Sequence, residues 1–316
     1  MSDTPPPPAA RSAPDASPVA GLGPWGAFAG CTLIWSSTFL VIRIGNDSLP
    51  PLWAAALRLA LAAALLGGIA RARGLRLPRG AALRTATAYG ALQFGLNFPL
   101  LYWGETILSS GLSAVLFATI PLTSGLFAHG FGLERLTPLK IAAALVGLGG
   151  VALIFGGQIR SAVPPLPFAA VLTAATAGSL ATVLLKRGPR QSPFVINAWG
   201  AAVGFPICLA ASLIAGERHP WPATPAMVVP LLYLTLAGSV GAFVLLSWLI
   251  PRWPVARISF IPEAVPMIAV VLGGLVRGER LNAEGIAGSL LVVVGAALAV
   301  VSDRMAARAG LAPRGR

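Results

Sequence analysis

The sequence predicts an all-α membrane protein of ten transmembrane helices, arranged as two inverted five-helix repeats with both termini in the cytoplasm. Three observations lead to this fold class. Hydrophobic residues make up 56% of the chain and charged residues only 10%, whereas soluble domains average about 25% charged residues. One stretch of sequence occurs twice, nearly half a chain apart. Finally, the lysines and arginines are distributed unevenly among the short segments that separate the apolar runs.

Ten apolar segments, each of roughly the length that spans a bilayer core, alternate with short polar connections. The predicted spans are 24–44, 51–70, 82–103, 106–130, 138–156, 166–186, 193–215, 226–249, 254–276 and 283–302. The connections between them leave no room for a soluble domain. Residues 1–20 are rich in proline and alanine and predict a disordered cytoplasmic tail. Residues 303–316 predict a basic cytoplasmic tail.

The repeated stretch is the strongest sign that the chain has two homologous halves. Residues 118–136 read ATIPLTSGLFAHGFGLERL, and residues 263–281 read EAVPMIAVVLGGLVRGERL. Each copy carries a proline thirteen residues before a glutamate and ends in Glu-Arg-Leu. Because each half has an odd number of spans, the second half must enter the membrane from the opposite side, as in inverted-repeat transporters. The predicted repeats are 24–156 and 166–302.

The basic residues predict the orientation of the chain. Of its 23 lysines and arginines, seventeen fall in the cytoplasm and five outside if the N-terminus is cytoplasmic, and Arg58 lies within a span. Since cytoplasmic loops carry the excess of basic residues, both termini are expected inside. This distribution explains the net charge of +13 without a nucleic-acid partner. Cys31 and Cys208 lie inside apolar runs, so neither a disulfide nor a metal site is expected, and no cofactor is predicted.

Several motifs resemble the EamA-type branch of the drug/metabolite transporter superfamily, and the resemblance covers residues 24–302. Residues 34–39, IWSSTF, are similar to the family's opening Trp-Gly/Ser-x-x-Phe pattern. Residues 57–59, LRL, resemble its arginine followed by an Ala/Leu-rich run. The two Pro…Glu-Arg-Leu stretches resemble its repeat motif, in which the second copy keeps a glycine before Glu279 and the first copy has Leu133 at that place.

The resemblance implies ten helices, cytoplasmic termini and a central cavity between the repeats. It also implies a multi-pass protein of a bacterial-type inner (plasma) membrane that exports or exchanges small metabolites. Amino acids, including aromatic ones, and amphipathic drugs are the substrates of such proteins. These motifs are specific for the fold and not for the substrate.

Two charged residues within predicted spans are the first candidates for substrate contact, because lipid offers a charge no partner. Arg58 lies in the second span and Glu263 in the ninth. Arg58 is predicted to present its guanidinium fork to a substrate carboxylate. Glu263 is predicted to bind a substrate amine or to carry a coupling proton. In the alternative interpretation the two charges neutralise one another, or Arg58 extends to lipid headgroups.

A polar stripe in the third span gives a second group of candidates. Tyr89, Gln93 and Asn97 recur every fourth residue and so predict one face of a helix. The stripe either lines the cavity and hydrogen-bonds the substrate or ties neighbouring membrane helices together. Tyr102 and Trp103, at the outer end of this span, are expected in the aromatic belt of the membrane surface.

Trp35 and Ser36 lie in the middle of the first span, where an aromatic belt does not explain a tryptophan. Trp35 is predicted either to stack on an apolar or aromatic substrate or to pack on another helix. By contrast, Glu134 and Glu279 fall at helix ends. They are expected to fix turns by capping or local ion pairing rather than to bind substrate.

Glycines in the last span of each half predict close contact between helices. They are Gly147, Gly149 and Gly150 in the fifth span and Gly285, Gly288 and Gly295 in the tenth. These two spans are expected to form a scaffold or a homodimer face, so both a monomer and a homodimer stay open.

A carrier working by alternating access is the function that these features favour, with a small-molecule substrate and membrane lipid as partners. An exporter of cationic amphipathic drugs, centred on Glu263 and the aromatic residues, is the alternative. An intramembrane enzyme is not expected, because His129 and His219 are too scattered for a catalytic or metal constellation. A non-transporting receptor would not explain why Arg58 and Glu263 place charges within membrane spans.

Overall fold

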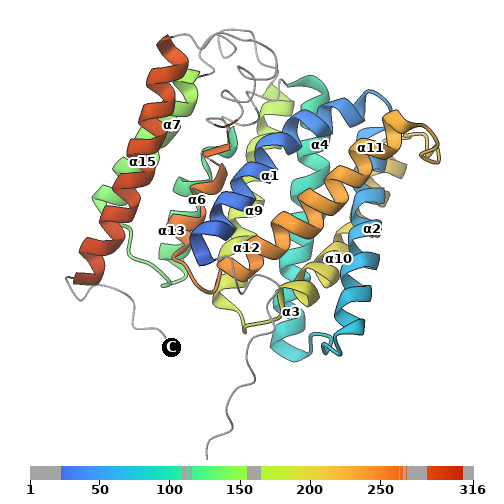
Figure 1. The fold of residues 1–316 in the computed structure, drawn as a ribbon, viewed down its shortest axis with the longest axis horizontal. Coiled ribbons are helices and arrows are strands. Elements are labelled where there is room, and N and C mark those ends of the chain that lie inside the picture. The colour runs from blue at the N-terminus through green and yellow to red at the C-terminus, as the bar shows by residue number, and fades with distance from the viewer. Residues whose placement is uncertain are drawn as a thin grey trace, which may run out of the picture.

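The structure is a computed structural model that describes residues 23–108, 113, 116–154, 165–262, 264–265, 268 and 283–308. Every regular element within these ranges is a helix (Figure 1). The first half of the chain holds α1 (Gly23–Asn46), α2 (Pro51–Ala72), α3 (Gly80–Gly90), η1 (Ala91–Leu96), α4 (Asn97–Ile107), α6 (Ile120–Gly130) and α7 (Pro138–Ile154). The second half holds α9 (Pro165–Arg187), α10 (Pro193–Ile214), α11 (Pro225–Tyr233), η2 (Leu234–Ala242), α12 (Phe243–Leu249), α13 (Val255–Ile258) and α15 (Ala283–Arg308).

Five of these helical stretches are long and apolar enough to cross a membrane. They are α1, α2, α9, α10 and the continuous run from Pro225 to Leu249 that α11, η2 and α12 form. Pro51, Pro193 and Pro225 begin three of them. A proline suits the first turn of a helix, because its backbone angle is already helical and its missing N–H has no partner there. Each of these helices starts within two residues of the predicted span.

The boundary between the third and fourth predicted spans is wrong. The helix that begins at Gly80 continues through η1 and α4 to Ile107, so residues 106 and 107 close the third span instead of opening the fourth. No glycine or proline follows Gly104 within α4 to end it earlier. The backbone becomes extended only at Leu108, where φ is −82° and ψ is 148°.

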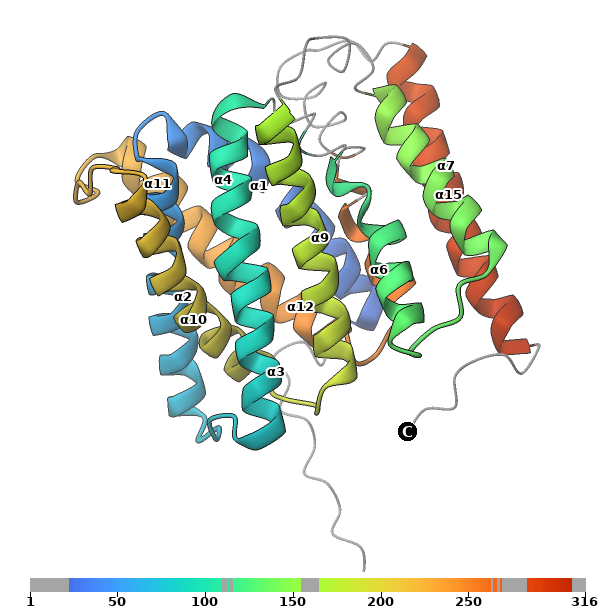
Figure 2. The same cartoon turned by 180° about the vertical axis from the view of Figure 1, so that it is seen from behind.

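The helices form a bundle with a separate pair along one flank. Figures 1 and 2 show α7 and α15 lying side by side, with α6 and α13 between this pair and the other helices. Glycine permits the close contact within the pair. A Cβ atom at Gly295 would lie 2.8 Å from the carbonyl oxygen of Ala143 and 2.8 Å from the amide nitrogen of Gly147. The predicted glycine contact is therefore confirmed for Gly147 and Gly295, whereas a Cβ at Gly149 would meet nothing within 4 Å.

Glu134, from the first copy of the repeated motif, ties the α6–α7 turn to α13. One carboxylate oxygen accepts a hydrogen bond from the backbone N–H of Val255, and the other accepts one from Ala256 at 3.4 Å. The second oxygen also pairs with Lys140 Nζ at 3.1 Å. The predicted capping and local ion pair are both confirmed, and the capped helix belongs to the other half of the chain. Glu279, its counterpart, lies outside the described residues.

Candidate functional site

A cavity of about 110 Å³ lies inside the bundle, and both halves of the chain contribute to its wall. One bound water needs about 10–15 Å³ of such space, so the cavity admits a small organic molecule. The aromatic rings in its wall belong to Trp35, Phe39, Phe98, Phe117 and Phe243. The polar side chains in its wall are Thr38, Arg58, Gln93, Asn97, Ser124, Ser179, Thr182 and Ser259.

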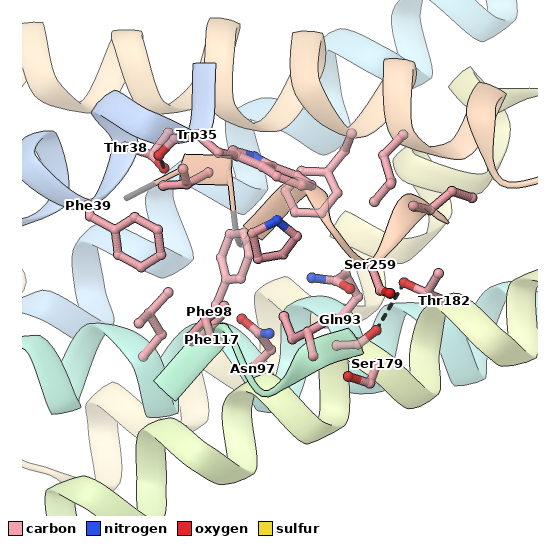
Figure 3. Close-up of a pocket in the computed structure, with 18 of the residues that line it drawn as sticks. Trp35, Thr38, Phe39, Gln93, Asn97, Phe98, Phe117, Ser179, Thr182 and Ser259 are labelled. Atoms are coloured by element: carbon pink, nitrogen blue, oxygen red, sulfur yellow. Dashed lines mark hydrogen bonds between the residues drawn. The ribbon is translucent and has the colours of Figure 1, made fainter. Parts of the chain in front are cut away.

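The two kinds of side chain gather at different ends of the cavity. Figure 3 shows the rings of Trp35, Phe39 and Phe98 toward one end, and Ser179, Thr182 and Ser259 toward the other. Two amides, those of Gln93 and Asn97, lie between these ends (Figure 3). The cavity therefore offers an apolar region and a hydroxyl-rich region to one ligand.

Arg58, on α2, is the charged group of the described wall. Its side chain is 3% exposed. Its Nε donates a hydrogen bond to Ser239 Oγ at 2.7 Å, and its Nη1 donates one to the Tyr102 hydroxyl at 3.0 Å. The guanidinium carbon also lies 4.7 Å from the centre of the Phe98 ring. The side chain thus points inward to neutral partners and not to lipid headgroups.

The charge of Arg58 is not balanced by any carboxylate that the structure describes. Within the described ranges the ion pair at 4 Å or less joins Lys140 to Glu134. Burying an ion is costly unless an opposite charge or several hydrogen bonds compensate for the loss of water. Two neutral hydrogen bonds and one ring leave part of this cost in place, so an anion that enters the cavity is stabilised beside Arg58. Glu263, the predicted partner, lies outside the described residues.

The π-helical stretch η2 makes room for the guanidinium. A Cβ atom at Gly238 would lie 2.8 Å from Arg58 Nη2, so a larger residue would displace the arginine. The next residue, Ser239, supplies the hydroxyl that accepts the Nε–H. Such π-helical turns occur frequently at functional sites. The local sequence around Gly238 therefore allows α2 and η2 to hold a buried cation between them.

Gln93 and Asn97 line the cavity as predicted, and Asn97 also ties two helices together. Asn97 Nδ2 donates a hydrogen bond to the Ala174 carbonyl on α9 at 2.8 Å. Both amides lie over Gly178, where a Cβ atom would come 2.9 Å from Asn97 Nδ2 and 3.6 Å from Gln93 Oε1. For Asn97 the structure thus confirms the tie between helices and the place in the cavity wall, and a hydrogen bond to the substrate stays a prediction.

Tyr89 and Ser36 are placed away from the cavity wall. Tyr89 is fully buried, and its hydroxyl donates to Asn197 Oδ1 on α10 at 3.2 Å. The wider turns of η1 follow Tyr89, so the spacing of an α-helix does not carry the stripe across this stretch. Ser36 Oγ donates to the carbonyl of Thr32 in its own helix at 2.6 Å.

Trp35 reaches the cavity and packs on a neighbouring helix at the same time. Its ring centre lies 5.3 Å from that of Phe243 on α12, in an edge-to-face arrangement. Both predicted roles of this residue are compatible with that position.

The predicted site leaves out three buried polar residues, of which two bond to Arg58 and the third follows one of them on α4. Tyr102 is 1% exposed and accepts a hydrogen bond from the arginine, so its assignment to the aromatic belt is wrong. Ser239 lies in an apolar run without a periodic pattern to mark it. Glu105 is 3% exposed and escapes because it stands in the gap between the third and fourth predicted spans.

The chain matches the EamA-like transporter family twice, over residues 24–156 and 166–301. It is 29% identical to an Escherichia coli K12 protein named uncharacterized inner membrane transporter YedA, over 82% of this chain and 84% of that one. It is also 29% identical to a probable terminal-alkyne amino-acid exporter of Streptantibioticus cattleyicolor, over 84% of this chain and 89% of that one. A probable amino-acid metabolite efflux pump of Salmonella typhimurium is 24% identical, over 86% of this chain and 93% of its own.

A solved protein crystal structure is among those that resemble the present fold. It matches 88% of this chain and 96% of its own with a TM-score of 0.72, and the two sequences are 20% identical. This likeness shows that the arrangement of helices occurs in a solved structure.

Proposed function

Because the two matches together span most of its sequence, the chain belongs to the EamA-like transporter family, and we propose that it exports or exchanges amino acids. It is a multi-pass inner membrane transporter, as its relatives and its membrane-length helices show. The proposed substrates are amino acids with apolar or aromatic side chains. The observation that carries this proposal is the buried guanidinium of Arg58 in an aromatic-lined cavity.

The groups in the cavity wall suit the three parts of such an amino acid. Arg58 would bind the carboxylate through a charge-assisted hydrogen bond, which contributes about 1.5–3 kcal/mol. The hydroxyls of Ser179 and Ser259 would accept hydrogen bonds from the ammonium group. Trp35 and Phe98 would pack on the side chain, since aromatic rings add favourable contacts to the burial of apolar area.

The proposed transport cycle is alternating access between two inverted five-helix repeats, 24–156 and 166–302, with both termini cytoplasmic. The two family matches, which end at 156 and 301, support these repeat boundaries. A cavity lined from both halves is where a site is expected when the repeats rock against each other. The basic residues support the orientation, since seventeen of them lie on the proposed cytoplasmic side.

Export of cationic amphipathic drugs is the second candidate. The aromatic wall suits such molecules, because cations are attracted to aromatic faces. The described wall carries the cation of Arg58 and no carboxylate, and this charge disfavours a cationic substrate. The amino-acid proposal is therefore the stronger of the two.

Uptake into proteoliposomes of the purified protein tests this proposal. The substrates are labelled phenylalanine, leucine, glutamate and lysine, together with a labelled cationic drug. We expect saturable uptake of phenylalanine or leucine that falls at least about tenfold in Arg58→Ala, since loss of the hydrogen bond costs about 1.4 kcal/mol or more. Arg71→Ala is the matched control, because Arg71 is an exposed arginine at the end of the same helix. Uptake of the cation alone, unchanged in Arg58→Ala, would favour the drug exporter.

A further inference from the structure

Glu105, in the last turn of α4, is a buried carboxylic acid that the cavity wall does not include. Its side chain is 3% exposed. Neither of its carboxyl oxygens has a hydrogen-bond partner among the described residues. Buried polar groups in folded proteins almost always have such partners, and exceptions often have a functional role. A buried carboxylate without partners is also costly, so Glu105 needs a compensating group or a proton.

Glu105 is connected to the cavity through one residue. Tyr102 precedes it by three positions on α4 and therefore lies on the same side of the helix. The Tyr102 hydroxyl accepts the hydrogen bond from Arg58 Nη1, so Glu105 shares a helix face with a direct partner of this arginine. A change of charge at Glu105 is thus felt at the arginine that lines the cavity.

The charged and titratable groups around Glu105 come from three neighbouring helices. Arg43, an exposed residue of α1, is a cation within electrostatic range of Glu105. The two side chains do not form an ion pair within 4 Å. Arg58 of α2 donates a hydrogen bond to Tyr102, and Cys208 of α10 is a buried thiol in the same region. Lys186 and Arg187 lie at the C-terminal end of α9. The end of α4 that carries Glu105 lies beside Pro167 and Val171, at the N-terminal end of α9, so these two cations are at the far end of that helix. No cation neutralises Glu105 by direct contact in the described part of the chain.

We propose that Glu105 is the proton-binding site of this transporter and that it binds its proton together with the substrate carboxylate at Arg58. The inference rests on the carrier function proposed above. When the substrate carboxylate binds, it adds a negative charge within the same poorly hydrated region. If the two negative charges lie about 10 Å apart, their repulsion changes an equilibrium roughly tenfold at an effective dielectric constant of about 20.

The proton balance follows from this linkage. A proton from water forms an O–H bond with the Glu105 carboxylate as the substrate binds, and the neutral acid returns the proton to water after the substrate leaves. Since each ligand raises the affinity of the site for the other by the same factor, the proton travels with the substrate, and export of both is driven by the outward gradient of the substrate.

The test is the affinity of the full-length protein for labelled phenylalanine, measured at pH 5.5 and 7.5 together with proton uptake in weakly buffered solution. We expect the wild type to bind roughly fivefold more tightly at pH 5.5 and to take up as much as about half a proton per bound substrate, which is the most that a tenfold linkage allows. Glu105→Gln mimics the protonated acid, so it is expected to bind tightly at both pH values and to take up none. Glu217→Gln is the control, because Glu217 has backbone and Ser212 partners outside the cavity.

Pronounced pH dependence in Glu105→Gln, or none in the wild type, would overturn this assignment. If Glu105→Gln does not fold, Glu105→Asp replaces it: a shifted midpoint supports the assignment, and an unchanged midpoint overturns it. Should the wild type bind no amino acid of the uptake panel at either pH, the carrier proposal itself would be the one to fail.

Discussion

The helices around the cavity and the α7–α15 pair are held together by different interactions. Around the cavity, buried polar side chains connect one helix to the next: Arg58 bonds to Ser239, and Asn97 bonds to the Ala174 carbonyl. In the pair, Gly295 packs directly on the backbone of α7. Lipid chains are as apolar as leucine, so membrane helices associate through close packing and hydrogen bonds. The bundle adds buried hydrogen bonds to close packing, which it also uses where a Cβ at Gly90 would lie 2.6 Å from the Cα of Gly200, whereas the pair relies mainly on close packing.

This difference gives the two regions separate roles. Polar groups beside the cavity can exchange partners with a substrate, whereas backbone contact through glycine has one favourable arrangement. The pair also presents large apolar side chains outward, among them Leu145 on α7 and Leu290 and Met305 on α15. We therefore regard the pair as a frame whose outer face contacts lipid or a second copy of the chain.

The largest expected effect is that of Gly295→Leu. Its side chain would meet backbone atoms of Ala143 and Gly147, which cannot move aside as a flexible side chain would. Overpacking usually costs 1–3 kcal/mol, and here we expect a loss in the free energy of unfolding of about 3 kcal/mol. Thermal unfolding of the purified protein measures it. Gly149→Leu is the control on α7, because this position faces open space, and equal losses in both variants would contradict the close contact.

Asn197→Ala should cause the next largest loss in the free energy of unfolding, because it removes hydrogen bonds within the bundle. Asn197 is fully buried and accepts the hydrogen bond from Tyr89, while its Nδ2 donates to the carbonyl of Phe243 at 2.9 Å and also to Ser247 Oγ. The variant leaves buried polar groups without partners and is expected to cost about 2 kcal/mol. Tyr89→Phe completes a double-mutant cycle, in which the double variant should lose less than the two single variants together. Simple additivity would show that the observed hydrogen bond contributes nothing.

Glu134→Gln tests the connection between the two regions. The substitution keeps the shape of the side chain but removes the charge that attracts the backbone N–H groups of α13 and Lys140. Since the Glu134–Lys140 ion pair is only partly buried, we expect a loss of about 1 kcal/mol in the free energy of unfolding. Lys140→Met, which leaves the contacts to α13 in place, should cost less. A larger loss in Lys140→Met would mean that the ion pair matters more than the capping.

The sequence predicts the helices and part of the site, and several of its failures share one physical cause. Membrane spans are visible because hydropathy is a local property, and Arg58 is visible because a charge within a span is rare. The positions of Tyr89 and Tyr102 depend on how the helix from Gly80 to Ile107 is wound. It contains the π-helical stretch η1, which alters the spacing on which face assignments depend. Ser239 lies in η2 and is missed for the same reason.

The smallest expected loss in the free energy of unfolding is that of Ser302→Ala. This variant tests how much the one described side-chain hydrogen bond between α15 and the start of α7 stabilises the pair. The hydroxyls of Thr137 and Ser302 lie 2.9 Å apart at one end of α7 and α15. Hydrogen bonds between membrane helices contribute about 0.6 kcal/mol on average, so the variant should lose about 0.5 kcal/mol or less. Thr137→Val should behave alike, and thermal unfolding measures both. A loss as large as that of Gly295→Leu would mean that hydrogen bonding holds this pair as it holds the bundle, and the distinction between the two regions would fall.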